Sequence, residues 1–598
     1  MRISSESYFR SFDSKELFFR TWQPNDINSK KAVIVIHRGH EHSGRLQEIV
    51  DGLNLSDTWM FAYDGRGHGK TEGPRGYAPD FSYLVKDLDT FAKFVSQKHG
   101  IPMENITVVA NSVGAVVAST WVHDYAPRIR AMVLAAPAFR VKLYVPFALP
   151  GLRLLNLVKN PAFISSYVKS RMLTHDPVEA RRYNEDPLIT RDISVNILIG
   201  LFDASTRVLA GAGTITTPTM VLSAGKDFVV EVGVQKKFFD ALGTSNKYMK
   251  IFKNFYHGVF YEKGREEGFK LAGAFIQNAM NSPVDRQDLL QSHKSGSTKD
   301  TYDQLMKPAS LLKAVNFGMQ KLMMSTVGRL SNGVSIGLKT GFDSGLSLDY
   351  IYENKARGIT PLGRLIDFFY INAVGWRGIR LRKVHMESLL EKSILELHAK
   401  NQPIRILDVA GGPGRYLLDI ANRHRDKNIQ ILVRDNVEGN LAHGRKLAQG
   451  MNLQNVTYQQ ADAFAGQSLN GYAPNIVIVS GFFELFGNND LIRQCVNHIA
   501  NESAPGATLL YTGQPYHPQQ EMIARTLPNR DGEAWVMRLR SQAEQDEIFR
   551  AAGFEKQDMQ IDPYGIFTVS KARKTDLLQT TSSKQMAAES MTERQLES

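Results

Sequence analysis

The chain of 598 residues has 43% hydrophobic residues and carries 72 Lys and Arg against 60 Asp and Glu, a formal net charge of +12. At about 150 residues per domain, this length exceeds what one hydrophobic core serves, so we expect roughly two to four domains. The single cysteine, Cys495, excludes an internal disulfide and a cysteine-based metal cluster, as is typical of a reducing compartment.

The positive charge and the lack of apolar spans bear on location and partners. The amino end, MRISSESYFRSF, lacks the apolar core of a signal peptide, and no apolar run approaches the roughly 18–20 residues that span a bilayer. We therefore expect a cytoplasmic protein. The charge fits either scattered surface residues or attraction to an anionic membrane surface. No zinc finger, RRM signature or basic-aromatic stripe is present, so we expect no nucleic acid partner.

In the first part of the chain, apolar runs alternate with amphipathic stretches, which predicts a parallel sheet with crossover helices. The predicted strands are KAVIVIH (31–37), WMFAYD (59–64), ITVVANS (106–112), AMVLAAP (131–137) and TPTMVLSAG (217–225). We take residues 1–280 as the first domain. Residues 281–303 are polar and rich in serine and lysine, which predicts a linker without a core.

A second alternating series predicts another sheet domain over residues 403–574. Its predicted strands are IRILDVAG (404–411), IQILVRD (429–435), NVTYQQAD (455–462), NIVIVSG (475–481), ATLLYTGQ (507–514) and IDPYGIFTVSKA (561–572). Residues 304–402 are predicted to be mainly helical, and residues 575–598 a mobile tail. The two series carry different motifs, so the predicted fold class is α/β with two distinct doubly wound sheet domains and no internal repeat.

A serine stands at a predicted strand-to-helix junction in VVANSVGAVVAS. Ser112 follows a strand ending at Asn111, and a helix starts at Val113. The small residues Ala110 and Gly114 on either side allow strand and helix to approach closely, so that the hydroxyl projects clear of the sheet. By itself this pattern fits a strand followed by a capped helix equally well.

Two later residues complete a catalytic set with Ser112. A serine hydroxyl needs a base to take its proton, and that base needs a partner that fixes its tautomer. Asp227 lies just past a strand in VLSAGKDFVV, and His257 lies 30 residues later in FKNFYHGVFYE. The loop HRGHEHSGR (37–45) follows an earlier strand. We expect the backbone N–H groups of Gly39 and Val113 to donate hydrogen bonds to an oxyanion.

This loop, the stretch DGRGHGKT (64–71), the serine turn and the spacing to Asp227 and His257 resemble the monoacylglycerol lipase and lysophospholipase group over about residues 10–275. The resemblance implies an α/β-hydrolase fold and a lipid or lysolipid ester as substrate. Alternatives are a peptidase or small-ester esterase on the same fold. We interpret the loop histidines and Asp64 as turn-forming residues and expect no metal. Arg38 departs from the family, which usually has glycine there, so its side chain either crowds the loop or meets an anionic head group.

Residues 139–210 occupy the place where such enzymes carry a lid. The segment VKLYVPFALPGLRLLNLVKNPAFISSYVKSRM combines apolar and basic residues without an acid. A basic amphipathic segment of this kind favours docking on an anionic membrane surface. Its apolar side chains equally suit the lining of an acyl pocket, and the two roles are compatible.

In the second domain, RILDVAGGPGRYLLDIA (405–421) predicts a strand, a glycine-rich turn and a helix. Asp408 ends the strand, and Gly411, Gly412 and Gly414 let the backbone turn sharply and approach a ligand at the start of the helix. This pattern alone also suits a dinucleotide.

Two further acids end the next strands. Asp435 is placed to accept ribose hydroxyls, and Asp462 lies where an adenine amino group would be. The set resembles class I methyltransferases over about residues 400–572, which implies S-adenosylmethionine as cofactor. A nicotinamide-dependent dehydrogenase is the alternative.

The helical residues 304–402 are expected to cover the cofactor and build the acceptor pocket. Glu484 after the fourth strand is either an acid/base group or a solvated residue. Arg377, Arg380, Arg382 and Lys383 either bind a phosphate or form a solvated helix face. The sequence thus predicts a bifunctional enzyme resembling bacterial hydrolase–methyltransferase fusions. A lipid- or protein-binding scaffold with two vestigial sites is the alternative of another class.

Overall fold

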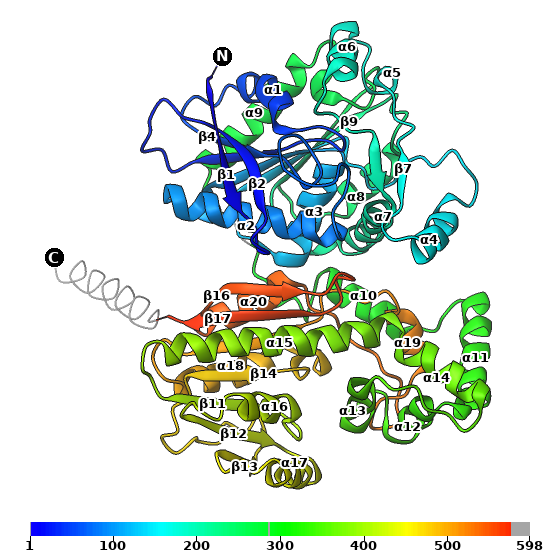
Figure 1. Cartoon of the computed structure of the whole chain (residues 1–598), viewed down its shortest axis with the longest axis vertical. Coiled ribbons are helices and arrows are strands. Elements are labelled where there is room, and N and C mark those ends of the chain that lie inside the picture. The colour runs from blue at the N-terminus through cyan, green and yellow to red at the C-terminus, as the bar shows by residue number, and fades with distance from the viewer. Residues whose placement is uncertain (1, 285–286, 576–598) are drawn as a thin grey trace, which may run out of the picture. The chain divides into compact units, whose positions relative to one another are not determined.

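The computed structural model describes residues 2–284 and 287–575, and the chain divides into two compact units between Gln287 and Asp288 (Figure 1). This corrects the predicted linker over residues 281–303. Its last residues begin helix α10 (Ser297–Met306), and Leu290 packs against a core cluster of the second unit. The polar composition of the segment does not indicate this packing, because it depends on a single apolar side chain, that of Leu290. The Asn489 side-chain amide also donates a hydrogen bond to the Leu290 carbonyl. The predicted mobile tail lies outside the described residues, apart from residue 575.

The first unit is built on an eight-stranded sheet in the order β1-β2-β4-β3-β5-β6-β9-β10, parallel from β4 to β10. Every residue of β3, β4, β5, β6 and β9 is buried, which explains the continuous apolar runs of these strands. The strands are β1 (Ser4–Arg10), β2 (Glu16–Trp22), β3 (Ala32–Ile36), β4 (Trp59–Tyr63), β5 (Ile106–Asn111), β6 (Ala131–Ala135), β9 (Thr219–Ala224) and β10 (Lys247–Phe252).

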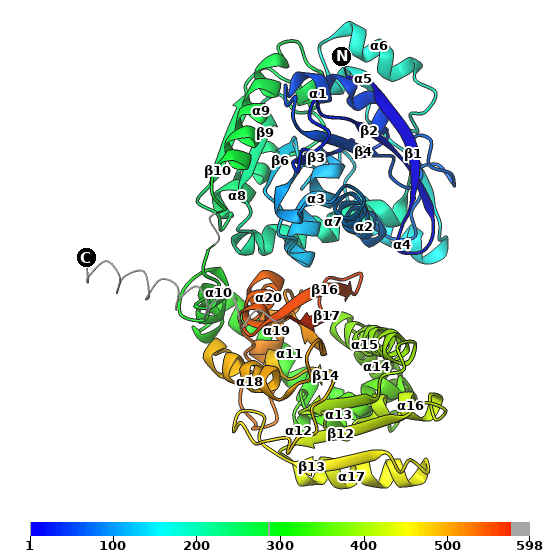
Figure 2. The ribbon, with the colours of Figure 1, turned by 90° about the vertical axis from the view of Figure 1, so that its left-hand side faces the viewer.

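Helices cover both faces of this sheet, as Figure 2 shows. Helices α1 (Gln47–Gly52) and α9 (Glu266–Asn281) pack together on one face, and α2 (Phe81–His99), α3 (Val113–Tyr125) and α7 (Val195–Ala210) pack together on the other. Helix α8 (Val232–Ala241) follows β9. Between β6 and β9 the chain inserts α7, a short 3-10 helix (Ala212–Thr214) and five further short elements. These are α4 (Ala148–Val158), β7 (Phe163–Ser165), α5 (Ser170–Leu173), α6 (Pro177–Glu185) and β8 (Asp192–Ser194).

The second unit has a seven-stranded sheet in the order β13-β12-β11-β14-β15-β17-β16. The first five strands in this order are parallel, and β17 is antiparallel to both of its neighbours. The strand order reverses between β11 and β14, which is where doubly wound sheets bind ligands. The strands are β11 (Ile404–Val409), β12 (Ile429–Asp435), β13 (Val456–Gln460), β14 (Ile476–Val479), β15 (Thr508–Gly513), β16 (Phe554–Ile561) and β17 (Thr568–Lys574).

The predicted strand over residues 561–572 is wrong in one respect, because it runs across a turn. Residue Ile561 ends β16, and β17 begins only at Thr568. The carboxylate of Asp562 accepts hydrogen bonds from the backbone N–H groups of Tyr564 and Phe567 and thereby closes the hairpin. A single apolar run therefore contains two strand segments.

Helices α15 (Val374–His398), α16 (Arg415–Arg423) and α17 (Glu438–Gly450) cover one face of the second sheet. Helices α18 (Asn489–Glu502), which buries Cys495, and α20 (Gln542–Ala551) cover the other. Residues 304–402 are mainly helical, and their helices share an apolar core with residues from later in the chain. Besides α10, this region holds α11 (Leu311–Ser325), α12 (Asn332–Thr340), α13 (Gly345–Glu353) and α14 (Pro361–Ile371), joined by α19 (Gln520–Thr526) from later in the chain. Within the described ranges, no helix is long and apolar enough to traverse a bilayer.

Candidate active sites

Ser112 occupies a strained turn between β5 and α3. Its φ of +53° lies in the left-handed region that a residue with a side chain rarely adopts. The Ser112 N–H donates a 2.8 Å hydrogen bond to the carbonyl of Ala135 at the end of β6. Glycine is required at position 114, because a Cβ there would lie 2.6 Å from the His37 carbonyl oxygen. The turn therefore holds the serine hydroxyl at the carboxyl end of the sheet.

The three residues predicted as a triad are in direct contact. Ser112 Oγ lies 2.8 Å from His257 Nε2, and His257 Nδ1 lies 2.8 Å from Asp227 Oδ2. The other Asp227 oxygen accepts backbone hydrogen bonds from Val229 and Val230 at 2.7 and 2.9 Å. Burial alone would raise the pKa of Asp227, but His257 and these N–H groups hold its pKa below the usual value. Asp227 is therefore ionised and orients the imidazole, so that Nε2 faces the serine.

An apolar cavity of about 520 Å³ opens onto the Ser112 hydroxyl. Gly39 and Val113 line it together with His257, and a Cβ on Gly39 would lie 3.1 Å from the Val113 side chain, so the two predicted donor residues are neighbours. Much of the remaining wall comes from the insertion between β6 and β9, including Leu143, Leu152, Leu155, Ile164, Ile193 and Leu201.

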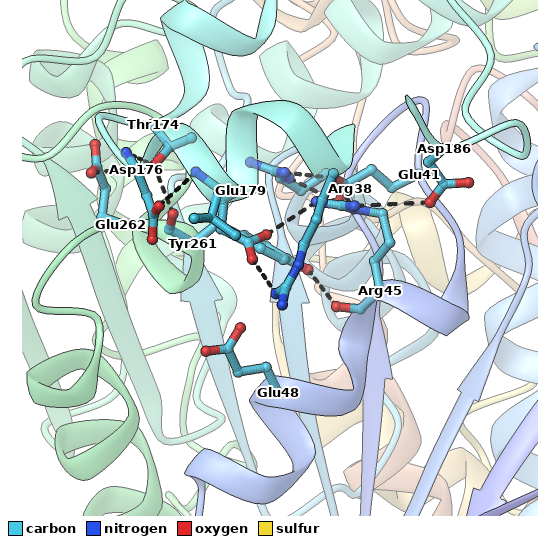
Figure 3. Close-up of polar contacts among 12 residues, drawn as sticks. Arg38, Glu41, Arg45, Glu48, Thr174, Asp176, Glu179, Asp186, Tyr261 and Glu262 are labelled. Carbon is cyan, nitrogen blue, oxygen red and sulfur yellow. Dashed lines mark hydrogen bonds and ion pairs between the residues drawn. The ribbon is translucent and has the colours of Figure 1, made fainter. Parts of the chain in front are cut away.

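Arg38 is buried in an ion pair, which changes the expectation drawn from its charge. Its Nε lies 2.9 Å and its Nη2 2.5 Å from the two carboxylate oxygens of Glu41, and its guanidinium lies 4.2 Å from the centre of the Tyr261 ring (Figure 3). Arg45 contacts the same carboxylate at 3.0 Å. Burial would raise the pKa of Glu41, but the two arginines lower it to about 2. Glu41 thus balances the Arg38 charge inside the protein, while Arg38 also lines the apolar cavity and its Nη1 has no hydrogen-bond partner in the described ranges.

The same charged cluster ties the insertion to the body of the first unit. Arg45 also contacts Glu179 of α6 at 3.3 Å (Figure 3). Arg265 at the start of α9 contacts Asp176 at 3.1 Å. Asp64 accepts hydrogen bonds from the backbone N–H groups of Ser43 and Lys70, which confirms it as a turn-forming residue. Among the residues that the structure describes, no cluster of side chains suited to hold a metal ion is present.

In the second unit, the glycine-rich turn is built around a buried carboxyl. A Cβ on Gly411 would lie 2.3 Å from Asp408 Oδ2, so only glycine fits beside this side chain. Neither carboxyl oxygen of Asp408 makes a hydrogen bond of standard geometry in the described ranges, although the Tyr416 hydroxyl lies close enough to oppose the effect of burial on its pKa. Burial raises the pKa of Asp408 to about 8, and the nearby Asp435 carboxylate adds to this effect. Asp408 is therefore a buried acid without a counter-charge.

The other two predicted acids also lie at this turn. Asp435 Oδ2 accepts a 2.9 Å hydrogen bond from the Gly412 N–H, so the carboxylate predicted to bind ribose also holds the turn. Asp462 and Ala410 line one small cavity of about 30 Å³. The backbone of Gly412 has a φ of +57°, and a Cβ there would meet no atom within 4 Å. The carboxyl groups of Asp435 and Asp462 beside this open, left-handed turn suit a ligand that carries amino and hydroxyl groups.

A second large apolar cavity, of about 400 Å³, lies at the carboxyl ends of β14 and β15. Gly481 and Glu484 follow β14 and line it, as does His517 after β15. Glu484 Oε1 accepts a 2.7 Å hydrogen bond from Thr512, whereas its Oε2 is buried without a partner in the described ranges. His517 Nδ1 accepts a hydrogen bond from the Gln519 N–H at 3.0 Å, so the proton of the neutral ring is on Nε2. Burial lowers the pKa of His517 to about 4.

The sequence alone does not decide the role of Glu484 and gives no sign of His517. The position of Glu484 after the fourth predicted strand is what marks it as a candidate. No local sequence pattern marks His517, because only the tertiary fold brings the loop after β15 to the cavity. The four basic residues predicted in this segment of α15 do not form one site: Arg377 is exposed, Arg380 and Lys383 are half-buried, and Arg382 is buried. Arg382 is buried beside Glu484 at 3.7 Å, Arg380 donates to the Ile371 carbonyl, and Lys383 contacts Asp419. The guanidinium of Arg377 lies over the ring of Tyr564.

Comparison with known proteins agrees with this division of the chain. Residues 27–264 match the family described as "Serine aminopeptidase, S33", and residues 272–574 match the family described as "Putative methyltransferase". The Escherichia coli K12 protein YnbC, described as uncharacterized, is 43% identical over 96% of this chain and 99% of its own length. Human monoglyceride lipase is 28% identical over 42% of this chain and 82% of its own.

Among solved structures, the monoacylglycerol lipase of Paleococcus ferrophilus is 23% identical, with a TM-score of 0.40, over 44% of this chain and 98% of its own. The family match over residues 27–264 and the likeness to human monoglyceride lipase identify the first unit as an α/β-hydrolase that resembles monoglyceride lipases. The chain as a whole belongs to the "Putative methyltransferase" family and carries a serine aminopeptidase S33-type hydrolase unit ahead of the methyltransferase unit.

Proposed function

We propose that the first unit is a serine hydrolase that cleaves a lipid or lysolipid ester. The observation that carries this proposal is the contact chain Ser112–His257–Asp227 at the end of a 520 Å³ apolar cavity. Human monoglyceride lipase and the Bacillus subtilis phospholipase YtpA are among the relatives of this unit, and their names point to the same class of substrate.

The geometry suits an acyl-enzyme mechanism. His257 Nε2 takes the proton of Ser112 as Oγ attacks the ester carbonyl carbon, and the N–H groups of Gly39 and Val113 donate to the oxyanion. The protonated imidazole, stabilised by Asp227, then gives its proton to the departing alcohol. Water, deprotonated by the same imidazole, releases the fatty acid and restores the serine.

The insertion carries a surface suited to a membrane. Four large apolar side chains in and beside α4, with no acid in the helix, are 64% to 86% exposed. They are Phe147, Leu154, Leu157 and Val158. Lys159 at the end of α4 adds positive charge, whereas Arg153 pairs with Asp203. A surface of this kind binds anionic lipid through apolar insertion and electrostatic attraction. We therefore place the site of ester cleavage at the surface of an anionic membrane.

A fluorophosphonate probe with a long alkyl chain tests the first activity. Labelling is expected for the full chain and for Ser119→Ala, a buried serine of α3 that bonds its own helix. Ser112→Ala should abolish labelling. Turnover of lysophosphatidylglycerol in vesicles, compared with a water-soluble short-chain ester, tests the substrate class. If Ser112→Ala is still labelled, the serine hydrolase proposal is wrong. If the short-chain ester is turned over faster than the lysolipid, the proposed substrate class is wrong.

For the second unit, we propose methyl transfer from S-adenosylmethionine to an acceptor held in the 400 Å³ cavity. Asp408, Gly411, Gly412 and Gly414 form the turn that would hold the cofactor, with Asp435 and Asp462 at the neighbouring strand ends. When bound, the cofactor supplies an activated methyl group. Such a transfer depends mainly on alignment and exclusion of water.

Glu484 is the group placed to accept a proton from the acceptor. Its Oε1 is held by Thr512, and its unpartnered Oε2 is the free base within the cavity lining. Arg382, 3.7 Å from Glu484, balances part of its charge. His517 lines the same cavity with a proton on Nε2, and it is placed to donate a hydrogen bond to the acceptor.

Calorimetric titration with S-adenosylhomocysteine tests the second activity without turnover. Asp435→Asn keeps an oxygen for the Gly412 N–H but removes the charge, and it should weaken binding at least about tenfold, or 1.4 kcal/mol. Asp426→Asn, at an exposed position paired with Lys427, is the matched control and should bind normally. Binding of a nicotinamide dinucleotide in place of S-adenosylhomocysteine would refute the methyltransferase proposal.

A further inference from the structure

Helix α11 of the second unit has an apolar surface that nothing within its unit covers. No residue of α11 is fully buried, and four of its large apolar side chains, three or four residues apart, are between 60% and 81% exposed. These are Leu311, Val315, Met319 and Leu322. Their spacing places them on one face of the helix, with Leu312 beside them at 86% exposed. An exposed apolar face of this kind marks an interaction site.

Helix α14 also has several exposed apolar side chains. Its Leu362, Leu365, Phe368 and Phe369 are 52% to 66% exposed. Both helices pack on the short turn Val327–Leu330. The shared support places the two exposed surfaces on the same helical cluster, which we call the α11–α14 face.

The charge of the α11–α14 face is positive. Helix α11 has two lysines and no acid; Lys313 pairs with Glu521 of α19, so the positive charge of the face comes from the exposed side chains of Lys321 on α11 and Arg364 on α14. The one acid of α14, Asp367, is fully buried and accepts hydrogen bonds from Ser331 and Tyr350. An apolar and basic face complements an anionic lipid surface. A second copy of the face would bring like charges together.

The α11–α14 face is continuous with the 400 Å³ cavity. Met323 of α11 is 58% exposed and Val327 is 45% exposed, yet both line the cavity. Ile366 and Tyr370 of α14 line it too. The exposed lining residues form a mouth at the α11–α14 face, and the polar groups Glu484 and His517 belong to the sheet side of the same cavity.

We propose that the methyl acceptor is a membrane amphiphile and that it enters the cavity from an anionic bilayer on which the α11–α14 face rests. The apolar body of the acceptor occupies the part of the cavity walled by α11 and α14, and its polar group lies against Glu484 and His517. The identity of the bound molecule as an acceptor rests on the methyltransferase function proposed above. The docking surface stands on exposure, charge and continuity with the cavity.

Photolabelling of the full chain tests this proposal at residue resolution. The probe is phosphatidylglycerol with a diazirine near the end of one acyl chain, mixed into phosphatidylcholine vesicles, and labelled peptides are located by mass spectrometry. We expect label in α11 and in cavity segments such as the one around Met522, and at least tenfold less with the same diazirine on phosphatidylcholine in neutral vesicles. Mapping by peptide separates this surface from the hydrolase insertion.

Three variants sharpen the result. Leu312→Ser with Val315→Ser changes exposed residues outside the cavity lining and should remove label from both α11 and the cavity. Leu395→Ser, at a 47% exposed position of α15, is the matched control and should leave labelling intact. Ala373→Trp fills the cavity and should remove label from the cavity peptides alone.

Each outcome bears on one proposal. Equal labelling in neutral and anionic vesicles, or label absent from α11, overturns the docking surface. Light scattering that shows a dimer broken by Leu312→Ser would assign the face to a second copy instead. Labelling that persists while S-adenosylhomocysteine fails to bind would overturn the methyltransferase function alone. Normal binding of S-adenosylhomocysteine without cavity labelling would overturn only this inference.

Discussion

Replacing Arg38 with methionine keeps most of the length of the side chain and removes its charge. The change leaves Glu41, which is fully buried, with Arg45 as its remaining cation at 3.0 Å. Removing one partner of a buried ion pair costs about 3 to 5 kcal/mol, and the remaining arginine places the expected loss near about 3 kcal/mol of unfolding free energy. At about 2 to 4 °C per kcal/mol, the Tm of the first unit should fall by about 6 to 12 °C.

Differential scanning calorimetry measures this loss, with the transition of the first unit identified by its response to fluorophosphonate labelling. Glu41→Gln and the double variant complete a cycle, in which the two changes should couple by at least about 1 kcal/mol because the groups are in contact. Arg153→Met is the matched control, since its pair with Asp203 is about half exposed and should be worth less than about 1 kcal/mol.

The same variant tests what Arg38 does for the substrate. Because Glu41 neutralises Arg38, the ratio of turnover between anionic and neutral lysolipids should stay unchanged in Arg38→Met. A stability loss below about 1 kcal/mol would refute the ion-pair reasoning. If Arg38→Met changes the ratio of turnover between anionic and neutral lysolipids but leaves the unfolding free energy unchanged, Arg38 contacts the substrate head group.

Three further predictions follow from the buried acids and the glycine turn. Burial raises the pKa of Asp408 from 3.8 to about 8, so the folded state keeps a proton that the unfolded state loses, and unfolding free energy falls as pH rises across that interval. Asp408→Asn should therefore raise the Tm of the second unit at pH 8 and leave it unchanged near pH 4; equal values at pH 8 would contradict this. The pKa of Asp227 is lowered in the folded state, so its stabilising contribution is present above about pH 4 and is lost as the pH falls below that value. In Asp227→Asn, the Tm measured by calorimetry should therefore fall less steeply as the pH is lowered below about 4. Gly411→Ala places a Cβ 2.3 Å from Asp408, and titration should show weakened binding of S-adenosylhomocysteine, whereas Gly439→Ala, where a Cβ meets nothing, should bind normally.

The sequence predicted those parts of the fold in which local pattern and burial coincide. The buried parallel strands β3, β4, β5, β6 and β9 of the first sheet and β11, β12, β14 and β15 of the second are predicted from their apolar runs, whereas the inner strand β2 (ELFFRTW) is not predicted. Strands β1 and β10 were missed, because SSESYFR and KYMKIF lie at sheet edges and keep several residues exposed. Strand β16 was missed over most of its length, since FEKQDMQI is largely polar.

The two candidate sites differ in how much of each could be predicted from the sequence. The triad was recognisable because each member stands beside its own strand in a fixed order along the chain, and the contacts among Ser112, His257 and Asp227 agree with that expectation. The Arg38–Glu41 pair was overlooked, although three residues separate the two charges in HRGHE. The acceptor cavity offered no such order, because its walls come from α11, α14, α15 and loops after β14 and β15, which only the tertiary fold brings together.

The place of β17 in the second sheet has a consequence for how the chain is made. This strand comes after every other strand in the sequence, yet it lies between β15 and β16. Domains synthesised first generally fold first. The hydrolase unit can therefore complete its sheet during translation, whereas the methyltransferase sheet keeps an open gap beside β15 until the last strand leaves the ribosome. During that interval the exposed edge of β15 is a target for chaperones and for mispairing.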